Sequence, residues 1–107
     1  SRNLQIATAA VDSVGMCIFI AFPALDIPDC LTSLIDMINA RYGLALTGDD
    51  VVSLGKTVLK TERKFNIEAG FNKEHDRLPE FFSLEPIAPH DALWDFSGEE
   101  IDAFWDF

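Results

Sequence analysis

The sequence predicts a small all-α domain, because its apolar residues recur at helical spacing and capping residues stand where those patterns begin and end. No stretch alternates between apolar and polar residues as a strand would. With 107 residues, the chain can build one modest core, so we expect a single helical domain over residues 1–107. The expected architecture is an irregular array of about five helices, with a proline-containing loop wrap between the last two.

The first two expected helices lie in the N-terminal half. One covers residues 4–11. Another follows Ile27, with Pro28 in its opening turn and Gly43 as its C-terminal stop. Its apolar positions fall three or four residues apart, at Leu31, Leu34, Ile35, Ile38 and Tyr42.

A third helix is expected from Thr47, whose side chain can cap it, to about Ile67 or Glu68. Gly55 inside this helix costs on the order of 1 kcal/mol relative to alanine. We therefore expect a close backbone contact at Gly55. The expected buried stripe of this helix is Val51, Leu54, Val58 and Phe65.

The C-terminal third of the chain is expected to be irregular and then helical. Residues 71–96 contain three prolines and few periodic positions, so we expect an ordered wrap without regular structure. Ser97-Gly98-Glu99-Glu100 is typical of a capping box and predicts a last helix from Ser97. Phe104, Trp105 and Phe107 crowd its end, so we expect this helix to continue in a longer protein and these rings to pack against segments outside the chain.

The composition excludes several classes of protein. Acids outnumber bases 18 to 8, which gives a net charge of -10 and argues against nucleic acid or an anionic membrane as partner. A hydrophobic content of 49% excludes a disordered acidic tail. The longest weakly polar run, residues 15–25, is about half of the ~20 residues that a membrane span needs. The N-terminal residues do not resemble a secretory signal, and two cysteines are too few for a disulfide scaffold, so we expect no signal and a cytoplasmic location.

The segment Asp12-Ser13-Val14-Gly15-Met16-Cys17 stands where the first helical pattern breaks. A thiolate is a suitable ligand for iron, but a 4Fe-4S cluster normally needs four of them. Asp-x-x-Gly is also a common turn at a helix end, and a lone cysteine beside apolar residues is most often a buried small hydrophobe. The segment by itself leaves both interpretations open.

Two later motifs extend the pattern. They are Glu62-Arg63-Lys64-Phe65-Asn66 followed by Gly70-Phe71, and Asp76-Arg77-Leu78-Pro79-Glu80-Phe81. In this order and at these separations, the three segments resemble the C-terminal region of the tungsten-containing aldehyde ferredoxin oxidoreductase family. The resemblance covers residues 3–107, although Glu68-Ala69 replace the family's usual arginine and glutamate.

The resemblance implies a role for each residue of the first segment. Cys17 would be one ligand of a 4Fe-4S cluster whose other three cysteines come from an earlier domain. Asp12 would bind the pterin that carries tungsten or molybdenum. Gly15 would let the backbone pass close to that cofactor, and Met16 takes the family's leucine position.

The resemblance also implies an activity for the whole protein. The parent would oxidise aldehydes to carboxylic acids and pass electrons to ferredoxin, and this chain would be a C-terminal piece of it. Its partners would be the remaining domains of the parent chain, ferredoxin and the aldehyde substrate. This piece alone is expected to hold no cofactor and to be catalytically silent.

Two alternatives stay open: an acidic helical protein-interaction module without catalysis, and a homologous domain that has lost its cofactors. Other polar residues are expected to be structural or surface groups. Glu62 and Arg63 are interpreted as a helix-surface pair, His75 and His90 as isolated, and Cys30 as packing. No Ser-His-Asp order, glycine-rich phosphate loop or HExxH motif supports independent hydrolase or nucleotide chemistry.

Overall fold

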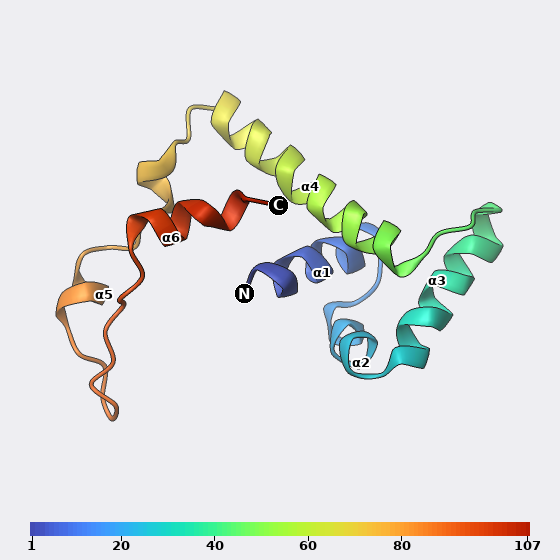
Figure 1. Ribbon diagram of the computed structural model, residues 1–107, viewed down its shortest axis with the longest axis horizontal. Coiled ribbons are helices and arrows are strands. Elements are labelled where there is room, and N and C mark those ends of the chain that lie inside the picture. Colours follow the sequence, from blue (N-terminus) through green and yellow to red (C-terminus); the bar gives the residue numbers. More distant parts are fainter. The chain divides into compact units, whose positions relative to one another are not determined.

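The computed structural model describes all 107 residues and confirms the all-α prediction (Figure 1). It contains six α-helices and three 3₁₀ helices, and no strand. The chain forms two compact units, Ser1–Arg63 and Lys64–Phe107, and the boundary between them falls inside helix α4 (Gly48–Glu68). The expectation of one domain over residues 1–107 stays a prediction.

The helices of the first unit begin and end largely where their capping residues predict. α1 (Arg2–Ser13) is two residues longer at each end than expected. α3 (Pro28–Tyr42) has Pro28 at its first position and ends at Gly43, whose φ of 66° is the left-handed conformation that glycine adopts without strain. α4 ends at Glu68, as predicted.

The first unit also contains helical structure that the periodicity does not predict, namely η1 (Ile18–Ile20) and α2 (Ala21–Asp26). Pro23 is the third residue of α2, where the backbone N–H would lack an intrahelical partner in any case, so the proline removes no bond. The Pro23 carbonyl accepts a hydrogen bond from the Ile27 N–H at 2.8 Å, which closes α2 just before α3 begins.

The core of the first unit is small and is built partly from small residues. The buried apolar side chains come from α1, α2 and α3, and they are Ile6, Ala10, Val11, Ala21, Ala24, Leu34 and Ile35. α4 joins this core through Gly55, which is buried and lies against the backbone of α1 at Ile6. The predicted close contact at Gly55 is thereby confirmed.

The predicted stripe of α4 is wrong at two of its four positions. Leu54 is exposed and Phe65 is 70% exposed, whereas Val51 and Val58 are half-buried. Because the glycine faces α1, the inward face of α4 is centred on Gly55. Successive residues turn by about 100°, so the side chains of Leu54 and Phe65 point to the flanks of that face.

The second unit ends in the predicted last helix, but the stretch before it is more regular than expected, because residues 71–96 include a 3₁₀ helix and a short α-helix. It contains η2 (Lys73–Asp76), α5 (Phe81–Leu84), α6 (Gly98–Asp102) and η3 (Ala103–Trp105). Between α5 and α6, one isolated antiparallel pairing joins Ile87 to Ala92, and the Trp94 N–H donates to the Phe82 carbonyl at 2.9 Å. These bonds order a loop that has no regular secondary structure.

Polar side chains fix the ends of the helices in the second unit. The predicted capping box at Ser97 is present: the Ser97 hydroxyl accepts from the Glu100 N–H, and the Glu100 carboxylate accepts from the Ser97 N–H at 2.8 Å. Asp102 in α6 pairs with Lys73 at 2.9 Å and with Arg77 at 2.8 Å. These ion pairs connect α6 to η2 and to Arg77, the residue after η2, which is 25 residues from Asp102 in sequence.

Candidate functional site

The segment Asp12–Cys17 forms a single capped turn at the end of α1. Gly15 has a φ of 76°. The Gly15 N–H donates to the Asp12 carbonyl at 3.0 Å, and the Met16 N–H donates to the Val11 carbonyl at 3.2 Å. This pair of bonds is the Schellman motif, in which a left-handed glycine satisfies the last carbonyls of a helix. The glycine at position 15 is therefore explained by the end of helix α1, independently of any cofactor.

Cys17 follows this turn at the start of the next helix. Its backbone is extended, with φ −63° and ψ 139°, and its carbonyl accepts a hydrogen bond from the Ile20 N–H at 2.9 Å. The residue is exposed and is a free thiol. Asp12 and Gly15 are also exposed, and Met16 is half-buried. The turn thus presents a carboxylate and a thiol at the surface, one at each end of a hydrogen-bonded loop.

Asp12 also lines an open groove between α1 and α4. The α1 wall consists of Leu4, Gln5, Thr8, Ala9, Asp12 and Ser13, and the α4 wall of Val58, Leu59 and Glu62. Glu62, which we interpreted as a surface residue, therefore shares a groove with Asp12. The position of Gly55 could have indicated this, because Glu62 lies seven residues later and so falls on the same face of α4.

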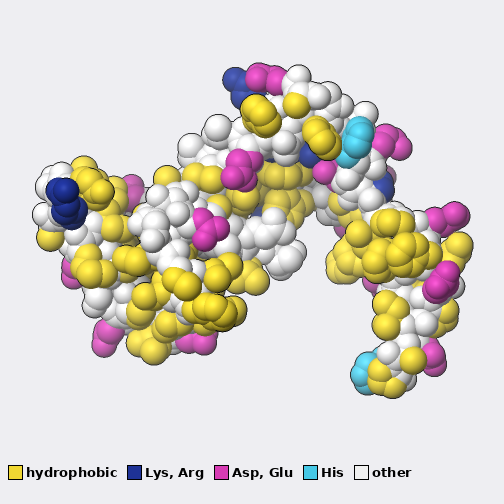
Figure 2. All heavy atoms as spheres, turned by 180° about the vertical axis from the view of Figure 1, so that it is seen from behind, with side chains coloured by type: hydrophobic (Ala, Val, Ile, Leu, Met, Phe, Trp, Pro, Cys, Tyr) yellow, Lys and Arg dark blue, Asp and Glu magenta, His cyan; other side chains and the backbone are white.

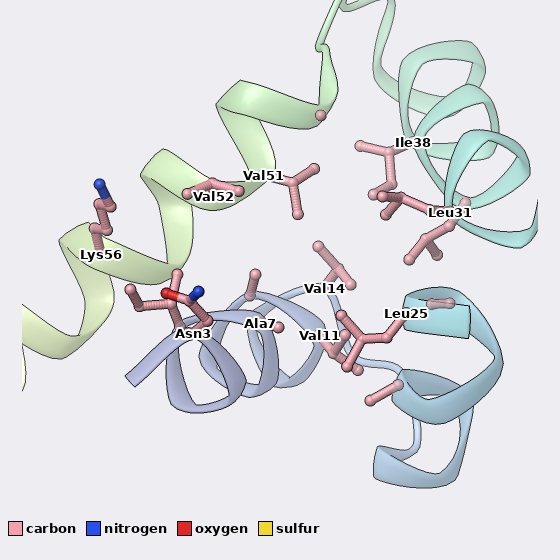
Figure 3. A pocket seen from close by; sticks show the side chains of 16 residues that line it. Asn3, Ala7, Val11, Val14, Leu25, Leu31, Ile38, Val51, Val52 and Lys56 are labelled. Carbon is pink, nitrogen blue, oxygen red and sulfur yellow. The ribbon is translucent and has the colours of Figure 1, made fainter. Parts of the chain in front are cut away.

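A second hollow of the first unit is a partly open apolar cavity of about 400 Å³ lined by residues of α1, α2, α3 and α4. Figure 3 shows Val11, Val14, Leu25, Leu31 and Ile38 around it. Asn3 and Lys56 are its most polar lining residues, and neither Asp12 nor Cys17 lines it. The cavity suits apolar groups and offers no acid, nucleophile or metal ligand for catalysis.

The second sequence motif adopts the same kind of turn as the first. At the end of α4, the Phe71 N–H donates to the Asn66 carbonyl at 2.9 Å and the Gly70 N–H to the Ile67 carbonyl at 3.0 Å. Gly70 has a φ of 100°. Both glycines of the resemblance therefore stand where L-residues with a side chain are strained.

The remaining candidate residues do not assemble into a site. The His75 ring accepts a hydrogen bond from the Asn72 N–H at 3.1 Å and so helps to cap η2. His90 is exposed, and Cys30 is half-buried at the start of α3. No group of three or more His, Cys, Asp or Glu residues could hold a metal ion. The structure brings no second candidate metal ligand together with Cys17 into such a group.

Comparisons with known proteins identify the family. The profile described as "Aldehyde ferredoxin oxidoreductase, domains 2 & 3" matches residues 1–101. Relatives named tungsten-containing aldehyde ferredoxin oxidoreductase occur in Pyrococcus horikoshii, Pyrococcus furiosus and Thermococcus kodakarensis, and are 37%, 36% and 33% identical over 84 residues. Each match covers 78% of this chain. No solved structure matches.

The chain is short beside these relatives. The matched region is 13% of the length of each of them. The profile match nevertheless runs across the Asp12–Cys17 turn and both later motifs. The chain therefore belongs to the aldehyde ferredoxin oxidoreductase family, within the region described as its domains 2 and 3.

Proposed function

We propose that this chain is part of an enzyme that oxidises aldehydes to carboxylic acids and transfers the electrons to ferredoxin. In this proposal Cys17 is one ligand of a 4Fe-4S cluster, and Asp12, Gly15 and Met16 contact the pterin that carries tungsten or molybdenum. The bound cofactors would supply the redox chemistry, and the protein would supply ligands, orientation and electrostatics. The remaining domains of the parent would provide the other cluster cysteines and most of the substrate pocket.

The observation that carries the proposal is the capped turn between Asp12 and Cys17. Its two backbone hydrogen bonds fix the backbone of the turn around Gly15, and Asp12 and Cys17 stand at its two ends. A turn whose backbone is already ordered lowers the conformational cost of binding a ligand at its ends. The exposure of the Cys17 thiol supports its availability to iron.

The chemistry of Asp12 suits a pterin. A carboxylate accepts two hydrogen bonds side by side, and the amide and amine edge of a pterin offers two N–H donors. Asp12 is exposed at the last turn of α1, and the glycine three residues later leaves room for the backbone to approach a planar ring. Asp12 would bind and orient the pterin, and no proton transfer is assigned to it.

The chain contains a matched pair of cysteines for a direct test. In the full-length protein, Cys17→Ser is expected to lower iron below four atoms per polypeptide and to abolish the electron paramagnetic resonance signal of the reduced 4Fe-4S cluster. Cys30→Ser is expected to leave both unchanged, because Cys30 is half-buried in α3. Full iron occupancy in Cys17→Ser would contradict the ligand role.

The cofactor-free alternatives predict a different result. A non-catalytic interaction module, or a relative without cofactors, would contain no tungsten, molybdenum or cluster iron even before mutation. Metal analysis of the unmodified full-length protein therefore separates these alternatives from the oxidoreductase. Membership of the family favours the oxidoreductase.

A further inference from the structure

The apolar cavity of the first unit has no part in the proposed function, because neither Asp12 nor Cys17 lines it. Its volume of about 400 Å³ lies within the range of ~300–1,000 Å³ that is usual for small-molecule sites. A cavity of about 150 Å³ with apolar walls already stays dry and binds benzene. The cavity is therefore large enough for a small apolar molecule, and its walls offer water few hydrogen-bond partners.

The lining of the cavity restricts the class of that molecule. Nearly all of the wall is aliphatic, and it includes no aromatic ring and no acidic side chain. The polar exceptions, Asn3 and Lys56, lie at one end, and Leu25 and Leu31 lie at the other (Figure 3). A long apolar wall with a polar end favours an elongated molecule, namely an alkyl chain with one polar group, because each methylene that leaves water for the wall stabilises the complex.

The residues at the polar end favour an uncharged group. Asn3 is exposed, and its amide both donates and accepts hydrogen bonds, as a hydroxyl does. The Lys56 ammonium points away from Asn3 in Figure 3, and the net charge of -10 disfavours an anion. A cation would find no carboxylate in the lining to pair with.

We propose that this cavity is a binding site for a neutral amphiphile, a molecule with one alkyl chain and one uncharged polar end such as a hydroxyl. The alkyl chain would lie among the aliphatic side chains of the four helices, with the polar end beside Asn3. The site goes beyond the proposed function and does not depend on the role of Cys17. The competing occupants are side chains from the rest of the parent polypeptide, which would leave no room for a ligand.

Calorimetric titration of the full-length protein with 1-octanol tests the proposal. We expect saturable binding of one molecule per polypeptide. From 1-butanol to 1-octanol, each added methylene should tighten binding about fourfold, because one more methylene leaves water. Octanoate, which has the same chain length and a charged end, should bind at least about tenfold more weakly.

Two results of this titration would overturn the proposal. The absence of saturable binding, which is the result expected if the rest of the polypeptide fills the cavity, would exclude the site. Octanoate that binds as tightly as 1-octanol would exclude an uncharged polar end as the basis of selection.

A pair of variants locates the bound alcohol. Such a pair is needed because other hydrophobic side chains also attract alcohols: Figure 2 shows them on the surface of the first unit, and Phe19 and Phe22 are among the exposed ones. Ala7→Leu fills part of the cavity and should weaken 1-octanol binding about tenfold or more, because leucine takes the place of roughly two methylenes of the ligand. Ala9→Leu makes the same change on α1, but Ala9 lines the groove that contains Asp12, so its affinity should stay unchanged. Equal affinity of the two variants would contradict binding in the cavity.

Stability measurements keep the variants interpretable. Filling an apolar cavity commonly stabilises a protein, so the midpoint of thermal denaturation of Ala7→Leu should equal or exceed that of the wild-type protein. If Ala7→Leu does not fold, the alcohol series and the octanoate comparison still decide the question, because they need no mutation. The iron content of Cys17→Ser tests the proposed function separately, since that residue lies outside the cavity lining.

Discussion

Gly55 of α4 lies so close to Ile6 of α1 that a methyl group on Gly55 would overlap the Ile6 carbonyl oxygen and lie 2.9 Å from the carbonyl carbon. A main-chain atom cannot move aside as the end of a flexible side chain can. The two helices therefore meet through their backbones at this point. This contact sets how α4 lies against α1. As a result, Glu62 of α4 and Asp12 of α1 line the same groove.

Gly55→Ala is therefore expected to destabilise the protein, although alanine is the better helix former by about 1 kcal/mol. Forcing α1 and α4 apart should cost about 1–3 kcal/mol and exceed that gain. Thermal denaturation of the full-length protein measures the effect, and hydrogen exchange should locate it in α1.

Gly48→Ala is the matched control for this substitution. Gly48 also lies in α4, but a methyl group there would meet nothing within 4 Å. Its midpoint of denaturation should stay the same or rise slightly. Equal destabilisation by both alanines would show that the loss does not arise at the contact with Ile6.

A second prediction concerns Asn39, whose side chain closes the loop between α3 and α4. Its amide donates to the Leu46 carbonyl at 3.0 Å, and its side-chain oxygen accepts from the Leu46 N–H at 2.8 Å. Asn39→Asp keeps the acceptor but places a negative oxygen against that carbonyl. It should cost about 1–3 kcal/mol of stability, because a partly buried acceptor would lose its donor. Denaturant unfolding measures this loss, and a neutral result would exclude a role for these bonds.

Local signals predicted most helix ends because each depends on a few neighbouring residues. Pro28, Gly43 and the Ser97 capping box act within one turn of their own position. α2 was not predicted, and the reason is also local. A proline usually interrupts a helix, but Pro23 lies in the first turn of α2, where it removes no intrahelical hydrogen bond. Sequence alone does not say where such a first turn begins.

The face that a helix buries depends on its neighbours, and this is where the sequence-based prediction failed. Leu54 and Phe65 fit an apolar stripe on α4, but Gly55 permits a closer approach than any side chain would. The candidate site could likewise be predicted only where it does not depend on packing between helices. The Asp12–Cys17 turn could be predicted because it is contiguous, whereas the groove that Asp12 shares with Glu62 depends on how α1 packs against α4.

A third prediction tests the turn itself. Gly15→Ala forces a residue with a Cβ into a φ of 76° and should cost about 1–2 kcal/mol. Nothing lies within 4 Å of the added methyl group, so the cost is conformational. Gly15→Asn should recover part of the loss, because asparagine tolerates this region better. Thermal denaturation of the full-length variants provides the comparison, and equal loss in both would argue against backbone strain as the cause.

A fourth prediction concerns Asp12 and the proposed pterin contact. Asp12→Asn removes the negative charge and replaces one acceptor by a donor, so the pterin content of the purified full-length protein is expected to fall at least about tenfold under limiting cofactor. Asp36→Asn, at an exposed position of α3, is the control and should retain its pterin. An unchanged pterin content in Asp12→Asn would contradict the proposed contact between Asp12 and the pterin.

The last prediction concerns pH and the pairing of Asp102 with Lys73 and Arg77 in the second unit. Hydrogen bonds from the Lys73 and Arg77 side chains lower the pKa of the Asp102 carboxyl below its usual value. A carboxyl whose pKa is lower in the folded state contributes stability that is complete above its unfolded pKa of about 4 and is lost as the pH falls through the folded pKa. The amides of α6 should therefore exchange faster in acid, after correction for the intrinsic exchange rate. Asp102→Asn should weaken this dependence but not abolish it, because the Glu100 carboxylate that caps α6 also has a pKa lowered by its hydrogen bonds to Ser97. Asp95→Asn, at an exposed position, should keep the wild-type profile. An α6 whose protection does not depend on pH in the wild-type protein would show that the Asp102 pairing does not hold η2 and α6 together.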